Sequence, residues 1–149
     1  MSTHDLLARL NQPWVQLIDV RSTEEYAGRD IRALRGGHIP GARNLPLGDT
    51  HDPDAIAALL APHLDSLDPR KETIVYGQVD ADAAPLAAWL QAQGFRHVRL
   101  YKGAWQAWGN RLELPASDER FADVNALRER ITALEQALDR LSPARLAGR

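Results

Sequence analysis

Three aspartates stand beside apolar runs that have the pattern of buried strands, and their side chains could do chemistry there. Asp19 lies in the run of residues 15–20, and Asp80 and Asp82 follow the run of residues 73–76. Carboxylate oxygens are the ligands that magnesium and calcium prefer. One interpretation is therefore a hard-cation site, although three aspartates form an incomplete ligand set.

A second interpretation of Asp82 is structural. Its carboxylate would cap a helix that begins at Ala83, with Pro85 tolerated in the first turn, and would accept hydrogen bonds from the free N–H groups there. None of the five histidines has a partner at the spacing of metal ligands. We therefore favour the cap, and we predict neither a metal site nor a cofactor.

The composition of the 149-residue chain excludes several classes of function. It contains no cysteine, which removes disulfides, thiolate metal sites, iron–sulfur clusters and any cysteine nucleophile. Its 18 basic and 20 acidic residues give a net charge of -2, so no nucleic-acid-binding field is indicated. No apolar run approaches the roughly 18 residues that span a bilayer. We expect a cytoplasmic protein with no nucleic-acid or membrane partner, and no small-molecule substrate is indicated.

Short apolar runs alternate with helical patterns along most of the chain. Strands are expected where apolar and β-branched residues are contiguous, and helices where apolar residues recur at spacings of three and four. The expected strands are residues 15–20, 44–47, 73–77 and 98–101, and the expected helices are residues 6–10, 24–26, 54–67 (interrupted at Pro62) and 86–95. Strands separated by helices predict an α/β fold, an open parallel sheet with helices on both faces.

Three motifs, in this order, resemble the signatures of the rhodanese family. The opening signature is matched by residues 17–26 (LIDVRSTEEY) and residues 36–46 (GGHIPGARNLP). The closing signature, in the form seen in thiosulfate sulfurtransferases, is matched by residues 101–110 (YKGAWQAWGN), with Leu114 and Pro115 beyond. The resemblance covers about residues 4 to 116, and the three motifs together are far more specific than any one of them.

The resemblance implies where an active site would lie and what it would need. In active members a cysteine follows the strand that ends here at Tyr76; it carries a sulfane sulfur cradled by backbone N–H groups. The matching loop in this chain is Gly77, Gln78, Val79, Asp80, Ala81, Asp82 and Ala83. Gly77 stands in the place of the nucleophile and has no side chain to carry sulfur. We predict no catalytic residue in this loop.

Two further departures from the family pattern act in the same direction. Asp80 stands where the family has a glycine that gives the loop its tight approach. Asp82 stands where the family has an arginine that attracts an anionic donor such as thiosulfate. A carboxylate about 6 Å from a dianion costs about 1 to 3 kcal/mol. The three changes together indicate a natural loss of the chemistry.

Asp19 and Arg21 have two interpretations. The family uses this pair beside the active loop, so the resemblance implies a positive charge from Arg21 at the mouth of the pocket. An aspartate and an arginine at the end of a buried strand also commonly form a pair that satisfies loop backbone groups. We favour this structural role, and we expect His38 to bond the backbone in its turn. Trp105 and Trp108, three residues apart, are expected to pack a helix onto the sheet.

Residues 117–149, beyond the resemblance, carry a heptad repeat. Apolar residues recur there at spacings of three and four: Val124, Leu127, Ile131, Leu134, Leu138 and Leu141. β-Branched residues at a positions and leucine at d positions favour a parallel two-stranded coiled coil. We expect Ser117 or Asp118 to cap this helix and Pro143 to end it.

The charges beside this repeat agree with a parallel pair. In register, Asp123 faces Arg128 and Arg130 faces Glu135, whereas a centred antiparallel pair opposes Arg130 to Arg130. The helix could instead lie against its own domain or pair with a helix of another protein. Six acidic and six basic residues within residues 117–149 disfavour a membrane-surface helix.

The sequence therefore predicts a rhodanese-like domain at residues 1–116 that has lost sulfurtransferase chemistry, and a C-terminal helix with a short tail at residues 117–149. We expect a binding, regulatory or scaffold module that forms a homodimer or docks another protein through this helix. The alternative is a thiosulfate sulfurtransferase whose cysteine at position 77 has been substituted.

Overall fold

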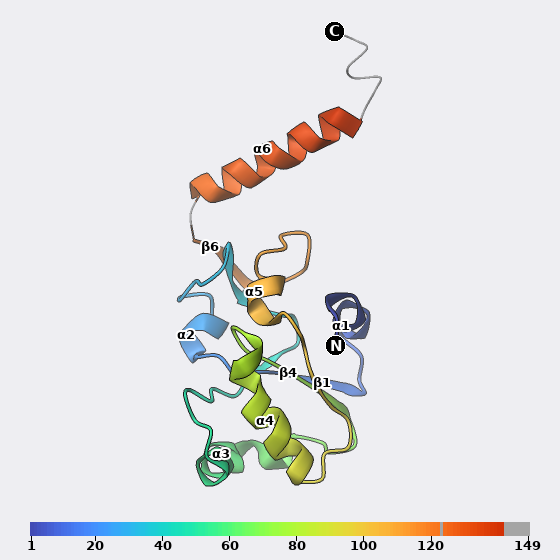
Figure 1. Ribbon diagram of the computed structural model, residues 1–149, viewed down its shortest axis with the longest axis vertical. Coiled ribbons are helices and arrows are strands. Elements are labelled where there is room, and N and C mark those ends of the chain that lie inside the picture. The colour runs from blue at the N-terminus through green and yellow to red at the C-terminus, as the bar shows by residue number, and fades with distance from the viewer. Residues whose placement is uncertain (123, 142–149) are drawn as a thin grey trace.

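A four-stranded parallel sheet forms the centre of the computed structural model, which describes residues 1–122 and 124–141 (Figure 1). All neighbouring strands in this sheet run parallel. Their order is β3 (Arg43–Asn44), β1 (Val15–Asp19), β4 (Glu72–Tyr76) and β5 (Val98–Leu100). The predicted α/β fold with an open parallel sheet is confirmed.

Helices connect these strands, as the alternating pattern predicts. They are α1 (Thr3–Arg9), α2 (Thr23–Tyr26), α3 (Pro53–Leu60), the 3-10 helix η1 (Ala61–Ser66), α4 (Asp80–Ala92) and α5 (Ala104–Trp108). The interruption expected at Pro62 is the change from α3 to η1, because proline has no N–H to continue the α-helical bonding.

The central strands are buried on both faces, which explains their continuous apolar runs. Ile18 and Val75 belong to a cluster that contains residues of α3 and α4. Leu17 and Ile74, their chain neighbours, belong to a second cluster with residues of α1 and α5. Successive side chains of a strand point to opposite faces, so each strand contributes to both clusters. The helices therefore cover both faces of the sheet, as predicted.

A second, antiparallel sheet joins β2 (Arg35–His38) to β6 (Ser117–Phe121). The prediction that Ser117 or Asp118 caps the C-terminal helix is wrong, because both residues belong to β6. The helix, α6 (Val124–Leu141), begins after this strand. A Cβ atom at Gly37 would lie 2.3 Å from the carbonyl oxygen of Ser117, so the close approach of the two strands requires glycine there.

Arg35 ties the C-terminal part of the domain to β2. Its guanidinium is buried and donates hydrogen bonds to the carbonyl oxygens of Leu114 (2.7 Å), Trp108 (3.0 Å) and Arg111 (3.0 Å). Trp108 ends α5, and Arg111 and Leu114 follow it, so one cation binds three carbonyl groups at and beyond the end of this helix. The chain beyond α5 is thus held against the domain before β6 begins.

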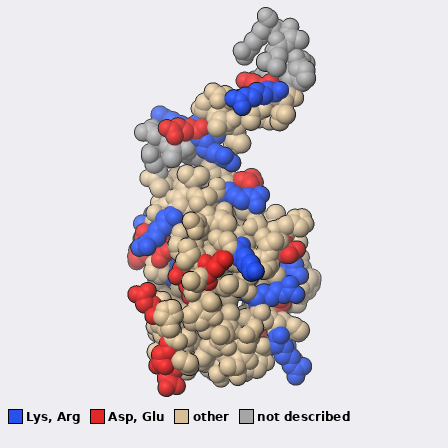
Figure 2. Space-filling model, viewed as in Figure 1, with Lys and Arg blue, Asp and Glu red and all other residues tan. Residues whose placement is uncertain are grey.

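α6 lies at one end of the molecule, beyond β6 (Figure 1). Positive and negative side chains are interspersed over the face of the molecule in Figure 2, in keeping with the net charge of -2. Among the described residues, no helix combines the length and the hydropathy that crossing a bilayer requires.

Trp105→Ala should lower the free energy of unfolding by about 3 to 5 kcal/mol, because it removes a fully buried indole from the core. The burial of Trp105 and Trp108 confirms their predicted packing on the sheet. Urea denaturation of the purified chain would measure the change. Trp14→Ala is the matched control: Trp14 is 58% exposed, and its loss should change stability by less than about 0.5 kcal/mol. Equal effects of the two substitutions would contradict this account of the core.

Candidate functional site

The loop between β4 and α4 lies at the carboxyl edge of the parallel sheet. A pocket of about 340 Å³ opens beside it, and its charged lining residues are Arg21, Glu25, Arg32, Asp49 and Asp82. Open α/β sheets bind ligands at this edge, where helix N-termini present free N–H groups. The geometry of the loop therefore decides what this pocket can do.

The carboxylate of Asp82 accepts hydrogen bonds from two backbone N–H groups of the loop. Its Oδ2 accepts hydrogen bonds from the backbone N–H of Gln78 (3.2 Å) and of Val79 (3.0 Å). The predicted N-cap role is wrong in position: α4 begins at Asp80, Val79 is the N-cap, and Asp82 is the third helical residue. Pro85 accordingly lies in the second turn. The carboxylate nevertheless neutralises free N–H groups at the helix start, as the structural interpretation required.

Gly77 is a glycine because there is no room for a side chain. A Cβ atom at this position would lie 2.6 Å from the Cβ atom of Asp82, and 3.3 Å from both Asp82 Oδ2 and Val20 Cγ2. Its φ angle is not in the left-handed region, so space rather than backbone conformation is limiting. Asp82 thus fills the volume into which a side chain at position 77 would point.

Asp80 faces a different neighbour. Its Oδ1 accepts a hydrogen bond of 2.8 Å from the backbone N–H of Gly103, which ties the loop to the turn before α5. Asp19 binds Arg21 instead. The structure therefore does not bring Asp19, Asp80 and Asp82 together as a ligand set. Within the described part of the chain, no group of three or more histidine, aspartate or glutamate residues could hold a metal ion.

Asp19 and Arg21 form a buried, hydrogen-bonded ion pair. Arg21 Nη2 lies 2.7 Å from Asp19 Oδ2, and the two side chains are 2% and 0% exposed. Arg21 Nη2 also donates to the carbonyl oxygen of Gly37 (2.6 Å), and the backbone N–H of Arg21 donates to Asp19 Oδ1 (2.9 Å). The guanidinium carbon lies 4.6 Å from the centre of the Trp105 ring. The pair satisfies backbone groups and stacks on α5, as its structural interpretation predicts.

The surroundings of this pair shift two pKa values. Burial acts to lower the pKa of Arg21, but hydrogen bonding to Asp19 and its negative charge outweigh burial and raise it. Burial, and then the charge of Asp19, raise the pKa of the Tyr76 hydroxyl well above its ordinary value. Tyr76 therefore stays neutral and accepts a hydrogen bond from the N–H of Ile39 (3.1 Å). Neither group is poised to exchange a proton near neutral pH.

The rhodanese-like domain family matches residues 2–111. The chain belongs to this family. It is 38% identical over 113 residues to a thiosulfate sulfurtransferase of Corynebacterium glutamicum, covering 66% of this chain and 37% of that protein. It is 33% identical over 115 residues to a thiosulfate sulfurtransferase of Azotobacter vinelandii, covering 74% and 42%. The sulfur carrier protein TtuD of Thermus thermophilus is 33% identical over 117 residues, with 66% and 40% covered.

The chain is also similar to solved structures. The anaerobic ergothioneine biosynthesis enzyme of Chlorobium limicola matches with a TM-score of 0.66 at 27% identity, over 78% of this chain and 27% of that chain. An EanB variant, in which ergothioneine is covalently linked to a persulfide cysteine, matches with a TM-score of 0.68 at 28% identity over the same shares. The rhodanese-like chain spans about two fifths of the length of the curated relatives it matches.

The pocket of this rhodanese-like domain also includes Ser22, Glu25 and Arg32, which the sequence did not single out as site residues. Gln78 Nε2 donates to the carbonyl oxygen of Arg32 (3.1 Å), and Arg32 binds Asp30 (3.2 Å) at the rim. Glu25 contributes an acid beside the Ser22 hydroxyl (3.1 Å). Arg32 comes from the irregular segment after α2, whose contacts have no periodic signal, whereas Glu25 lies in α2 and Ser22 caps that helix. His38, by contrast, bonds the carbonyl oxygen of Tyr26 (2.8 Å), which confirms its predicted backbone bonding.

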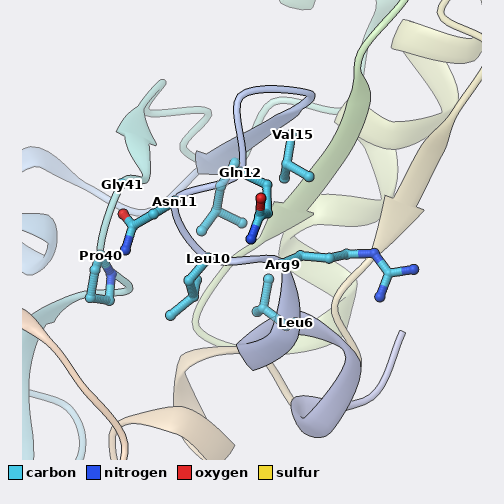
Figure 3. Close-up of a pocket in the computed structure, with 9 residues that line it drawn as sticks. Leu6, Arg9, Leu10, Asn11, Gln12, Val15, Pro40 and Gly41 are labelled. Carbon is cyan, nitrogen blue, oxygen red and sulfur yellow. The ribbon is translucent and has the colours of Figure 1, made fainter.

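A second cavity lies away from the loop, between α1, the start of β1 and the turn at Pro40 and Gly41 (Figure 3). Its volume is about 80 Å³, and Leu6 and Leu17 form part of its wall. Arg9, which also lines it, is bound to Glu72 at 2.7 Å. The cavity is too small for a drug-sized ligand.

The heptad residues lie on α6 and are exposed where the structure describes them. Ile131, Leu134, Leu138 and Leu141 are 46%, 47%, 61% and 79% exposed. The side chains of Val124 and Leu127 lie outside the described residues, as do residue 123, the predicted end at Pro143 and the rest of the tail. The part of the predicted apolar seam that is described therefore faces solvent.

Asp19→Asn should lower the free energy of unfolding by about 3 to 5 kcal/mol, because it leaves the Arg21 cation buried without its counter-charge. Thermal and urea denaturation would measure the loss. The control is Asp30→Asn at the exposed pair with Arg32, which should leave the midpoint unchanged within error. An unaltered midpoint for Asp19→Asn would contradict the structural role of the buried pair.

Gly77→Ala should destabilise the domain by about 1 to 3 kcal/mol, because its Cβ atom must displace Asp82 or α4. The same change in an Asp82→Gly background should cost clearly less, since the opposing Cβ atom is gone. A double-mutant cycle by urea denaturation measures this coupling. Additive effects of the two substitutions would show that Asp82 does not occupy this volume.

Proposed function

We propose that this rhodanese-like domain does not transfer sulfur and acts as a binding, regulatory or scaffold module, docking a protein partner through α6. Sulfur transfer in its relatives' manner needs a nucleophilic thiol, and the chain has no cysteine. Gly77, Asp80 and Asp82 all differ from the family pattern, and each difference disfavours the binding of a sulfur anion in the loop. The domain keeps the fold and its buried support, and it lacks the reacting atom.

The two hydrogen bonds of the Asp82 carboxylate carry this proposal. Free N–H groups at a helix start stabilise a bound anion or a developing negative charge. In this chain the N–H groups of Gln78 and Val79 are already bound to Asp82 Oδ2. An incoming thiosulfate or a persulfide anion would lose these donors and would also meet a negative charge, which repels it by about 1 kcal/mol per unit charge at 4 Å in water.

The alternative is a thiosulfate sulfurtransferase whose cysteine at position 77 has been substituted. The names of the relatives in Corynebacterium glutamicum and Azotobacter vinelandii favour it. The 2.6 Å approach between a Cβ atom at Gly77 and that of Asp82 argues against a simple substitution, because a cysteine there requires a change at Asp82 as well. We therefore prefer the inactive module.

The exposed apolar residues of α6 support a docking role. An isolated helix of this length is only marginally stable in water, and most helices in proteins gain their stability by packing an apolar face. Ile131, Leu134 and Leu138 present such a face while leaving about half or more of each side chain in solvent. A partner that covers these residues would stabilise the helix.

Transfer of sulfur from thiosulfate to cyanide should be indistinguishable from the blank for the unmodified chain and for Gly77→Cys. Gly77→Cys with Asp82→Gly should form thiocyanate above the blank, because the double substitution supplies the thiol, makes room for it and releases the N–H groups of the loop. Asp82→Gly alone is the matched control and should stay at the blank.

Gly77→Cys with Asp82→Ala distinguishes the effect of space from the effect of charge. Alanine removes the carboxylate but keeps the Cβ atom that crowds position 77. It should give less product than the glycine combination. Circular dichroism verifies that each variant is folded. Thiocyanate formation by the unmodified chain would refute the proposed function, and full activity of Gly77→Cys alone would refute the blocking role of Asp82.

A further inference from the structure

α6 presents an apolar seam that its own domain leaves open. The domain approaches the seam at Leu112 and Glu113, which line a shallow depression of about 460 Å³ with Arg130 and Leu134. Leu134 nevertheless remains 47% exposed. Toward the C-terminal end the seam is more exposed still, and in Figure 1 this end points away from the domain. The seam therefore needs a partner from outside the chain.

The seam has the spacing of a two-stranded coiled coil over the whole described helix. Ile131 and Leu138 occupy a positions, and Leu134 and Leu141 occupy d positions. A β-branched residue at a with leucine at d is the combination that parallel dimers prefer. Residues at e and g flank the seam and decide which helix fits it. Arg130 at g and Glu135 at e are the charged pair nearest its middle.

These two charges discriminate between the arrangements of two identical helices. In a parallel, in-register pair, Arg130 of each copy faces Glu135 of the other, which gives two attractive contacts. In a centred antiparallel pair, Arg130 is opposed to Arg130, and this contact repels. The chain is thus complementary to itself in the parallel orientation.

We propose that α6 pairs with α6 of a second copy of this chain, parallel and in register. This inference rests on the docking role in the proposed function and names its partner. The two rhodanese-like domains then lie at the same end of the coiled coil, with their β4 to α4 loops on one assembly. The interface buries Ile131, Leu134, Leu138 and Leu141 against their counterparts.

Light scattering over a concentration series of the full chain tests self-association. The mass should rise to twice the 16.5 kDa of one chain. Arg130→Glu should weaken the dimer about tenfold, because two attractive pairs become two repulsive ones. Combined Arg130→Glu and Glu135→Arg should restore the original affinity, since the opposite charges face each other again. Arg140→Glu makes the same charge change at an outward c position and should leave the affinity unaltered.

Disulfide trapping tests the relative orientation of the two helices. Because the chain has no native cysteine, only the introduced thiols can cross-link. Leu141→Cys places a thiol at a d position near the helix end, so a parallel pair should cross-link completely under mild oxidant. In a centred antiparallel pair the two thiols are separated by about 25 Å, at 1.5 Å of rise per residue, and no cross-link forms. Gln136→Cys on the outward f position is the matched control and should not cross-link.

A monomer at every concentration would overturn the inference, and so would a dimer that Arg130→Glu leaves intact or that Leu141→Cys fails to trap. A monomer that forms a complex only with another protein's helix also overturns it, while leaving the docking role in place. Thiocyanate formation by the unmodified chain would overturn the proposed function without touching the dimer. The two failures are therefore distinguishable.

Discussion

The buried ion pair between Asp19 and Arg21 organises the carboxyl edge of the sheet. Asp19 ends β1, and its carboxylate holds a guanidinium that in turn binds the carbonyl oxygen of Gly37 and stacks on Trp105. One cation thereby connects β1, β2 and α5. Because a buried charge without a partner is costly, the chain must keep both members of the pair or lose both. The pair explains how the domain retains a shaped pocket without the reacting group.

Two aspartate side chains bind backbone N–H groups in and beside the loop next to this pair. The carboxylates of Asp82 and Asp80 accept from the N–H groups of Gln78, Val79 and Gly103. A helix start normally leaves several N–H groups free, which is why such sites attract anions. Here the carboxylate of Asp82 already binds the N–H groups of Gln78 and Val79. The pocket beside the loop is lined by side chains of both charges, among them Arg21, Arg32 and Asp82.

The apolar residues of α6 are less buried than those of the domain. The domain buries its apolar residues in two clusters on either side of a sheet, whereas the described seam residues of α6 stay largely exposed and Leu134 approaches the domain at Leu112 and Glu113. A helix gains most of its stability by packing an apolar face, and the described apolar residues of α6 are left largely exposed by their own domain. Because the pocket lies in the domain and the proposed pairing uses α6, substitutions can alter the pocket and the pairing independently. A parallel pair would place two pockets on one particle, which suits a scaffold.

Local pattern determined much of this protein. The alternation of helices and strands and the parallel sheet buried on both faces follow from periodicity and from the motifs around Asp19 and Trp105. The absence of cysteine is a property of composition alone. These features depend on residues that are close together in the chain, so the spacing of residue types in the sequence predicts them. The seam of α6 is likewise a matter of spacing, but its pairing stays a prediction.

Only the tertiary structure decided how the loop is filled and where the C-terminal helix begins. The place of Asp82 in the first turn depends on the backbone angles of Val79, and its closeness to Gly77 depends on how α4 leaves the sheet. Residues 117–121 form β6 because β2, far earlier in the chain, offers a partner. Such contacts join residues that are distant in sequence, and the local periodicity of the sequence does not predict them. The structure therefore shows that Asp82 fills the space beside Gly77, whereas the sequence displays only two separate departures from the family pattern.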